Sequence, residues 1–225
     1  MDRVERDLVV VHVVFGLVAV AVLLAPGAMA QGWRIAALVV VYHLASVAGS
    51  VRHDDGRWLR AWWFAAVLSV FQVIPDAVLA EGLGTLVFPP DGFPDIGPVT
   101  GFMAGLWTIP IVLIVMAADT ADRRRGTRAG WLTAVVVAAL VFASAEAVLP
   151  PLGIWEPVGV TTIGHVAWYV VPPELLLGAA AWWGLQVTRV RPPWVVVPVA
   201  AGVSLLYTGA LAASWLLIER GLLGG

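Results

Sequence analysis

Long apolar stretches separated by short polar segments run through the whole chain. Crossing about 30 Å of hydrocarbon takes a helix of about 20 residues, and seven stretches are close to that length or longer. They cover residues 8–29, 33–51, 59–80, 99–118, 130–149, 163–187 and 194–217. Helices are expected because backbone N–H and C=O groups must pair internally within lipid. The pattern predicts an all-α, integral membrane bundle of seven transmembrane helices, formed by residues 1–225 as a single domain.

The arginines predict the orientation of this bundle. All 13 basic residues are arginine, and eleven fall at the N-terminus or in the segments 52–60, 119–128 and 189–191. Loops rich in arginine stay in the cytoplasm. We therefore expect a multi-pass protein of the inner (plasma) membrane, with its N-terminus cytoplasmic and its C-terminus outside. The first stretch ends in Ala-Met-Ala, like a signal peptide. We interpret it as a retained helix, because its removal would break the alternation of the arginine-rich segments.

Composition excludes several classes of function. The chain has no cysteine, which removes disulfides, thiolate catalysis and cysteine-bound metals. It also has no lysine, so the retinal Schiff base of seven-helix rhodopsins is impossible. The chain lacks the extended basic tail that would suggest a nucleic-acid partner. Arginine without lysine, together with abundant Ala, Gly and Val, is typical of GC-rich bacterial genomes.

Two expected outer segments differ from ordinary polar loops. Glu81–Pro98 and Pro150–Thr162 are rich in glycine and proline and contain no arginine. They fold back over a cavity as a lid, dip into the bilayer where protein surrounds them, or rest on the membrane interface. Most of the tryptophans lie near helix ends, as an aromatic belt does. Trp107 and Trp168 are expected deeper, where they would face a cavity.

Ionisable residues inside apolar spans are costly and are candidates for function. Glu174 is expected near the middle of the membrane, with Tyr207 at about the same height, and Asp76 and Glu146 in the outer third. Further polar candidates are Gln72, one turn from Asp76 on the same face, and His165, near the outer mouth. Prolines 75, 110, 172 and 173 interrupt three spans. They produce either packing kinks or helix breaks that line a cavity.

These residues suit acid-initiated chemistry on a lipophilic molecule. Burial disfavours the charged form of a carboxyl group, so we expect a protonated Glu174 that acts as a general acid. Asp76 or Glu146 would assist it. Aromatic faces stabilise cations, and the aromatic candidates for substrate binding are Phe71, Phe102, Trp107, Trp168, Tyr169 and Tyr207. An acid in such a pocket would protonate an alkene or epoxide of an isoprenoid-like substrate and start carbocation cyclisation.

We expect no cofactor and no metal. His12 and His43 lie in the inner half of their spans and would be placed to ligate a haem, but helix packing is the commoner role of such histidines. Asp91 and Asp95 lie four residues apart in an outer segment that has no nearby arginine, so we interpret them as part of a loop turn.

The chain resembles the small membrane-bound terpene cyclases of meroterpenoid pathways in its seven spans, isolated intramembrane carboxyl groups and lack of a metal motif. The segment from Pro172 and Pro173 through Glu174 is also similar to the Pro-x-Glu-Glu segment of membrane lycopene cyclase domains, with Leu175 in place of the second glutamate. The resemblance implies a membrane cyclase and carries over only Glu174. The meroterpenoid enzymes have an acid in the last span, where this chain has none until Glu219.

Two other hypotheses remain open. The third and sixth spans each contain a proline followed by an acid, at Pro75-Asp76 and Pro173-Glu174, as a weak inverted repeat would. That feature favours a small proton-coupled transporter. Alternatively, the chain is a non-catalytic assembly module whose acids pair across subunits. The sequence does not predict the oligomeric state.

Overall fold

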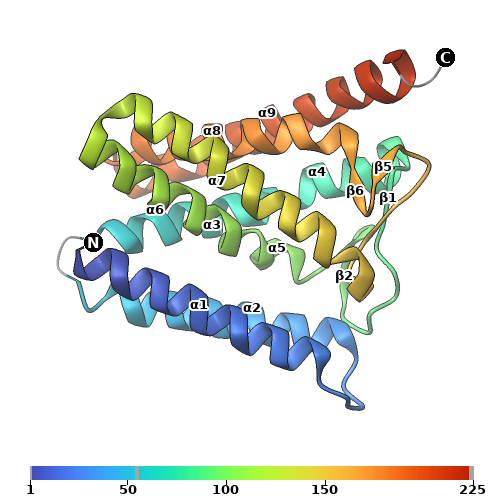
Figure 1. Ribbon diagram of the computed structural model, residues 1–225, viewed down its shortest axis with the longest axis horizontal. Coiled ribbons are helices and arrows are strands. Elements are labelled where there is room, and N and C mark those ends of the chain that lie inside the picture. The colour runs from blue at the N-terminus through green and yellow to red at the C-terminus, as the bar shows by residue number, and fades with distance from the viewer. Residues whose placement is uncertain (1, 54–55, 223–225) are drawn as a thin grey trace.

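The computed structural model describes residues 2–53 and 56–222, which form a mostly helical bundle (Figure 1). The helices are α1 (Arg3–Leu24), α2 (Gln31–Ser50), α3 (Arg57–Phe71), α4 (Val73–Ala77), α5 (Met103–Leu106), α6 (Thr108–Arg125), α7 (Thr127–Val148), α8 (Val171–Thr188) and α9 (Val196–Trp215). The π-helical segments η1 (Val78–Leu83) and η5 (Leu216–Leu222) extend α4 and α9, and short 3₁₀ turns lie at η2 (Pro150–Leu152), η3 (Trp168–Val170) and η4 (Pro193–Val195). In the described part of the chain, six helical segments are long and apolar enough to cross a membrane.

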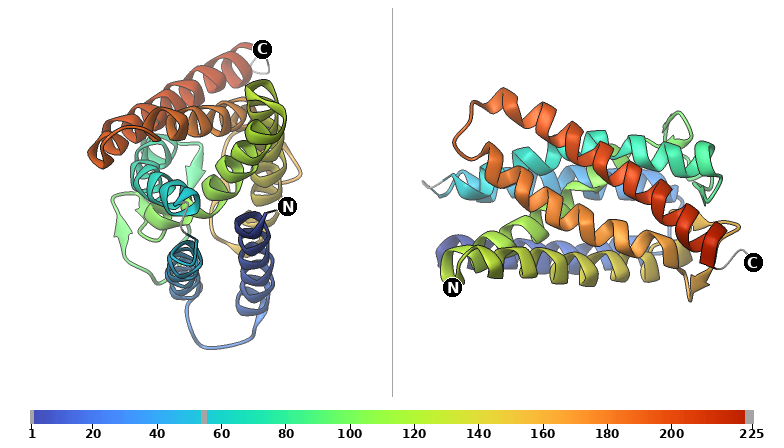
Figure 2. Two further views of the ribbon diagram at one scale, coloured as in Figure 1. Left: turned by 90° about the vertical axis from the view of Figure 1, so that its left-hand side faces the viewer. Right: turned by 90° about the horizontal axis from the view of Figure 1, so that it is seen from above.

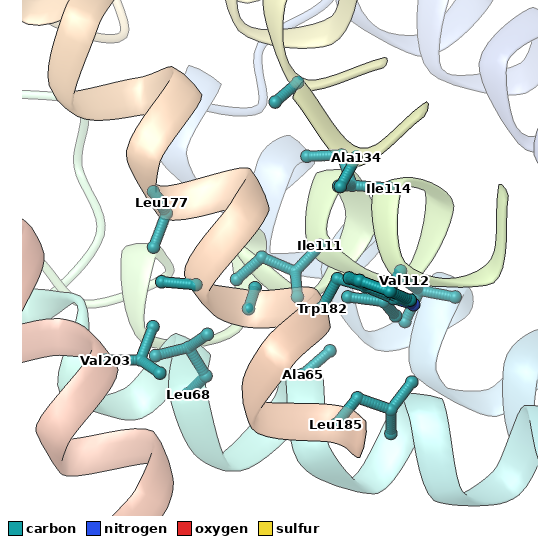
Figure 3. Close-up of a cluster of buried hydrophobic side chains, with 14 of the residues drawn as sticks. Ala65, Leu68, Ile111, Val112, Ile114, Ala134, Leu177, Trp182, Leu185 and Val203 are labelled. Carbon is teal, nitrogen blue, oxygen red and sulfur yellow. The ribbon is translucent and has the colours of Figure 1, made fainter. Parts of the chain in front are cut away.

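Helix α8 lies among the other helices and is less apolar than those six. Its Leu177, Trp182 and Leu185 pack against α3, α6 and α9 (Figure 3). Small residues on α8 allow α7 to approach closely. A Cβ atom added to Gly178 would lie 2.4 Å from the Cβ atom of Ala138 on α7, well inside van der Waals contact. Many residues of α8, Glu174 among them, are buried against neighbouring helices, so α8 can carry an acid on its protein-facing side.

The start of α8 corrects the expected sixth span of residues 163–187. Pro172 and Pro173 occupy the first turn of α8, where a backbone N–H has no helical partner and proline is accepted. They begin the helix instead of interrupting it. The preceding residues form an antiparallel hairpin of β5 (Thr162–Ile163) and β6 (Val166–Ala167), which turns at Gly164 with φ +65°.

Two other boundaries also differ. Pro110 lies in the first turn of α6, so it does not break that helix either. Residues 119–125, expected in a cytoplasmic loop, continue α6 to Arg125. The chain then reverses at Gly126, whose φ of +83° favours glycine, and α7 starts at the next residue. As a result Asp119 is buried inside the bundle.

The two apolar outer segments pair with each other, an arrangement that an all-α prediction did not include. Strand β1 (Leu86–Val87) is antiparallel to β4 (Glu156–Pro157), which joins the α4–α5 connection to the α7–α8 connection. A second hairpin pairs β2 (Asp95–Ile96) with β3 (Val99–Thr100). Figure 1 shows these strands at the end of the bundle opposite the N-terminus.

Arginines from the expected cytoplasmic segments meet at the N-terminal end of the bundle. Arg123 and Arg124 pair with the buried Glu5 of α1, while Arg123 and Arg189 pair with Asp119. The Arg57 side chain donates a hydrogen bond to Asp2 at 2.9 Å. These ion pairs hold the start of α1 to α3 and α6.

Asp2 also begins α1 as its N-cap, with a capping box formed by Glu5. Burial raises the pKa of the Asp2 carboxyl, but hydrogen bonds from the Glu5 backbone N–H and the Arg57 guanidinium outweigh it and lower the pKa to about 2. The contacts that Asp2 makes as a carboxylate therefore persist throughout the neutral range.

The α7–α8 contact can be tested by adding one methyl group. Gly178→Ala should destabilise the protein by about 1–3 kcal/mol, because Ala138 and the Ala134 carbonyl leave no room for a Cβ atom. Gly202→Ala in α9 is the matched control, since a Cβ atom there meets nothing within 4 Å. Heating the purified protein in detergent and measuring what remains monodisperse gives both midpoints. Equal midpoints would contradict the close packing.

The ion pairs at the N-terminal end predict that replacing two nearby acids will lower thermal stability to different extents. Glu5→Gln should lower the thermal midpoint, because it leaves Arg123 and Arg124 without the buried carboxylate that they share. Asp7→Asn should have little effect, since Asp7 is partly exposed and pairs with the exposed Arg6. Thermal unfolding at low and high salt measures both. A loss on Asp7→Asn as large as that on Glu5→Gln would contradict this account.

Candidate functional site

A cavity of about 490 Å³ lies between α6, α7, α8 and α9, below the paired outer segments. Its lining is mostly apolar and includes Leu79, Met103, Leu113, Val141 and Val170. The volume falls within the range of about 300–1,000 Å³ that is typical of small-molecule sites. The cavity is large enough to hold a small molecule.

Three carboxyl groups line this cavity: Asp76, Glu146 and Glu174. Asp76 lies on α4 and is 3% exposed, Glu174 lies in the first turn of α8 and is 5% exposed, and Glu146 lies near the end of α7. Glu146 is close enough to both other acids to interact with them electrostatically. Residues from α4, α7 and α8, far apart in the sequence, thus form one acidic cluster.

The cluster has no cationic partner among the residues that line the cavity. Asp76 accepts a hydrogen bond of 3.0 Å from the Trp107 indole N–H. The Trp155 indole lies close to Glu146. Carboxylates that share an apolar site repel one another, so full ionisation of all three would be costly. This environment favours at least one neutral carboxylic acid.

Aromatic side chains surround the acids. The Trp107 ring lies 5.7 Å from the Phe142 ring and 6.1 Å from the Tyr207 ring, measured between centroids. Tyr207 is buried and interacts electrostatically with Glu174. The hydroxyl groups of Tyr169 and Thr85 are hydrogen-bonded at 2.7 Å, which fixes Tyr169 at the cavity wall. The rings therefore present π faces and edges close to the carboxyl groups.

The outer segments cover the cavity. Thr85, Leu86 and Phe88 from the first segment and Trp155 and Pro157 from the second all line it. This geometry matches the lid, which is one of the three interpretations that the sequence leaves open. The β1–β4 pairing holds both segments in that position.

Trp168 and His165 do not line the cavity, because α8 starts later than expected. Both were expected inside a long sixth span, but α8 begins only at Val171. Trp168 therefore falls in the 3₁₀ turn before α8 and is 46% exposed, and His165 is exposed in the β5–β6 hairpin. The same shift moves Glu174 from its expected position near the middle of a helix to the first turn of one.

Gln72, Phe71 and Phe102 lie near the cavity but do not line it. Gln72 is fully buried and accepts a hydrogen bond of 3.2 Å from the Ser204 hydroxyl, which turns it towards α9. Phe71 packs against the main core. Phe102 belongs to a second apolar cluster, and its ring is tilted against that of Phe93 with 6.0 Å between the centroids. Gln72 was expected on the same face as Asp76, but it turns towards α9 while Asp76 lines the cavity. For Phe71 and Phe102, helical spacing gave only the approximate height.

Several lining residues were not expected from the sequence. Phe142 lies one turn from Glu146 on α7, and that spacing predicts a shared face. Trp155 had been interpreted as part of the interfacial belt. Thr85, Leu86 and Phe88 reach the cavity because the outer segment folds back over it, which local sequence does not predict. Gly16 of α1 carries no sequence signal at all.

The candidate cofactor residues have other partners. The His12 imidazole is hydrogen-bonded to the Tyr42 hydroxyl at 3.0 Å, and His43 accepts from the Trp62 indole N–H at 3.1 Å. Asp91 accepts hydrogen bonds from the Thr100 hydroxyl and the Phe93 backbone N–H, as in a loop turn. Within residues 2–53 and 56–222, no group of three His, Cys, Asp or Glu side chains could hold a metal ion.

Comparison with known proteins identifies a family whose region contains nearly all of the cavity residues. Residues 73–218 match the family described as a domain of unknown function (DUF6989). The chain belongs to the DUF6989 family. No curated protein and no solved structure matches it. The DUF6989 region starts with α4 and ends in η5, so it contains all three cavity carboxyl groups. Among the described residues that line the cavity, only Gly16 lies outside this region.

The Asp76–Trp107 hydrogen bond predicts a coupling between the two residues. Asp76→Leu should destabilise the protein by about 1–3 kcal/mol, because it leaves the indole N–H without an acceptor. Combining it with Trp107→Phe should cost less than the sum of the single changes, since the phenyl ring needs no acceptor. Thermal unfolding of the four proteins in detergent gives the coupling, and additive losses would contradict it.

Proposed function

We propose that this protein is a membrane-embedded isoprenoid or terpenoid cyclase in which a buried carboxylic acid protonates an alkene or an epoxide. The observation that carries the proposal is that Asp76, Glu146 and Glu174 line one apolar, aromatic cavity without a cationic partner among its lining residues. An ion transporter would need a polar path, whereas this lining is almost entirely apolar. The substrate would be a lipophilic, isoprenoid-like small molecule.

Glu174 is the proposed proton donor. It is almost completely buried, and its electrostatic neighbour Glu146 is a second carboxyl group, so both burial and charge repulsion favour the neutral form of Glu174. Asp76 is the better candidate for a charged partner, because the Trp107 N–H donates to it and stabilises a carboxylate. In this proposal Glu174 donates the proton and Asp76 is the charged partner, because the environments of the two carboxyl groups differ.

The reaction is balanced without a cofactor. The O–H bond of Glu174 breaks, and the proton forms a C–H bond with the π electrons of the alkene, or an O–H bond at the epoxide oxygen. The resulting carbocation is attacked by the next double bond of the same chain, which closes a ring. The final cation loses a proton to a carboxylate, Glu146 or Asp76, and proton exchange within the cluster restores Glu174. Substrate and product are isomers.

Aromatic faces would stabilise the cation between these steps. Trp107, Tyr169 and Tyr207 line the cavity, and each ring interacts favourably with positive charge. The cover formed by the outer segments would exclude water, which would otherwise trap the cation as an alcohol. Trp168, His165, Phe71, Gln72 and Phe102 have no direct part in this proposal, because none of them lines the cavity.

The proposal includes a bacterial inner-membrane location with seven spans, the N-terminus in the cytoplasm and the C-terminus outside. It is supported by the six apolar helices, by the length of α8 (18 residues) and by the ion pairs that gather arginines from several segments at one end. In this orientation the acids lie in the outer half of the bundle, below the paired outer segments.

The test is cyclisation by membranes that contain the protein. Membranes incubated with prenylated aromatic compounds and their terminal epoxides should convert one of them to a product of equal mass with fewer double bonds. In D2O a protonated alkene product should carry one carbon-bound deuterium. Glu174→Gln should lower the rate by about 10²–10⁴-fold, as loss of a general acid does.

Glu156→Gln is the matched control, because Glu156 lies in strand β4 next to the cavity residues Trp155 and Pro157 but is exposed. It should retain the wild-type rate. Mass spectrometry and NMR identify the product, and gel filtration checks the fold of each variant. Absence of any cyclised product, or full activity in Glu174→Gln, would overturn the proposal.

A further inference from the structure

Helix α1 enters the main core of the bundle at one end only, and along the rest of its length its partner is α2. Its buried residues, Val4, Glu5 and Leu8, all lie in its first two turns. From residue 9 to residue 24, no side chain of α1 is buried. At the far end, Arg34 donates hydrogen bonds to the carbonyl oxygens of Val22 and Ala25 and ties α1 to α2. Figure 2 shows α1 and α2 as a pair at one side of the bundle.

Gly16 lies in this uncovered part of α1 and lines the cavity. A Cβ atom added to it would meet no heavy atom within 4 Å, so open space adjoins the helix there. Its neighbours Val13 and Leu17 are 56% and 68% exposed, respectively. The cavity wall at α1 therefore has a gap beside Gly16, and exposed apolar side chains lie on both sides of this gap.

The opposite edge of this gap is formed by α6 and α7. Ile109 and Leu113 of α6 and Ser144 and Val148 of α7 line the cavity, and the two α7 residues are exposed. The Ser144 hydroxyl donates to the Leu140 carbonyl oxygen at 2.6 Å, so it needs no water partner. Glu146 lies two residues along α7. The cavity thus reaches from the carboxyl cluster to an apolar outer face of the helices.

We infer that the cleft between α1 and the α6–α7 pair is a lateral entrance, through which an isoprenoid chain enters the cavity directly from the lipid bilayer and which Gly16 keeps open. The identity of the chain rests on the proposed function, whereas the entrance rests on the geometry alone. A hydrated solute would have to lose its water beside Leu17 and Val148, which disfavours a polar occupant. An apolar chain has no such cost.

The test measures how fast a probe enters the full-length protein in phospholipid vesicles. The probe is a 20-carbon prenyl alcohol with a diazirine at the end of its tail, added rapidly and activated by a light flash after increasing delays. Mass spectrometry of peptides from residues 103–113 and 141–149 reports entry. Gly16→Phe should slow labelling by about tenfold, which corresponds to about 1.4 kcal/mol in the barrier, and should leave the final extent unchanged.

Matched controls separate entry from folding and from cavity filling. Val18→Phe should label at the wild-type rate, because Val18 is exposed, lies on the opposite face of α1 from Gly16 and does not line the cavity. On α7, Ser144→Trp should slow labelling while Ala143→Trp should not, although both positions are exposed. Gly16→Ala should retain most of the rate, as expected for a steric effect that grows with side-chain size.

Three results would overturn the entrance. The first is an unchanged labelling rate in Gly16→Phe. The second is a loss of final labelling in Gly16→Phe as large as the loss of rate, which would place Gly16 in the binding cavity. The third is the absence of specific labelling in the wild type. Equal labelling by a saturated 20-carbon alcohol would overturn the choice of an isoprenoid occupant. Normal labelling and entrance effects without cyclised product would refute the cyclase proposal while leaving the entrance intact.

Discussion

The free-energy cost of removing a carboxyl group from water is the main physical constraint on this structure. Asp76 and Glu174 are almost completely buried in a bundle whose other spans are nearly all apolar. The fold limits this cost by bringing the acids together with Trp107 and Trp155, whose indole N–H groups are the available donors. It does not supply a cation at the cavity. At the other end of the bundle, Glu5 and Asp119 are also buried, but arginines neutralise them. The two ends thus bury carboxyl groups in different ways, with arginine partners at one end and without a cation among the cavity-lining residues at the other.

Much of the helical architecture follows from hydrophobic length and the arginine pattern. Those signals are local, so they gave the helices to within a few residues wherever a polar segment ended a stretch. They failed where apolar residues continued beyond the helix. Residues 163–170 are as apolar as a span, yet Pro172 and Pro173 set the helix start at Val171. The opposite error occurred at residues 119–125, where charged residues remain helical because Asp119 and Glu5 pair with arginines there.

The cavity was predicted only in part, because its formation depends on tertiary contacts. The three acids, Trp107, Tyr169 and Tyr207 were all candidates on the basis of depth, and the structure brings them together. Depth alone does not specify direction, so Gln72 and Phe102 were equally good candidates at that stage. The pairing of β1 with β4 involves residues about 70 positions apart, and no periodicity in either segment encodes it. Gly16 was missed because a glycine in an apolar helix is indistinguishable from one used for packing.

The pairing of the two outer segments has a mechanical consequence. Since β1 and β4 share backbone hydrogen bonds, the connection after α4 and the connection before α8 must move as a unit. Opening the bundle towards that side would require separating this small ladder and exposing Leu86 and Trp155 together. The roof over the carboxyl groups is thus better described as a fixed cap than as a pair of flaps. If the proposed cyclase reaction takes place, an electron-deficient intermediate formed beneath this cap would be consumed by elimination and not by hydration.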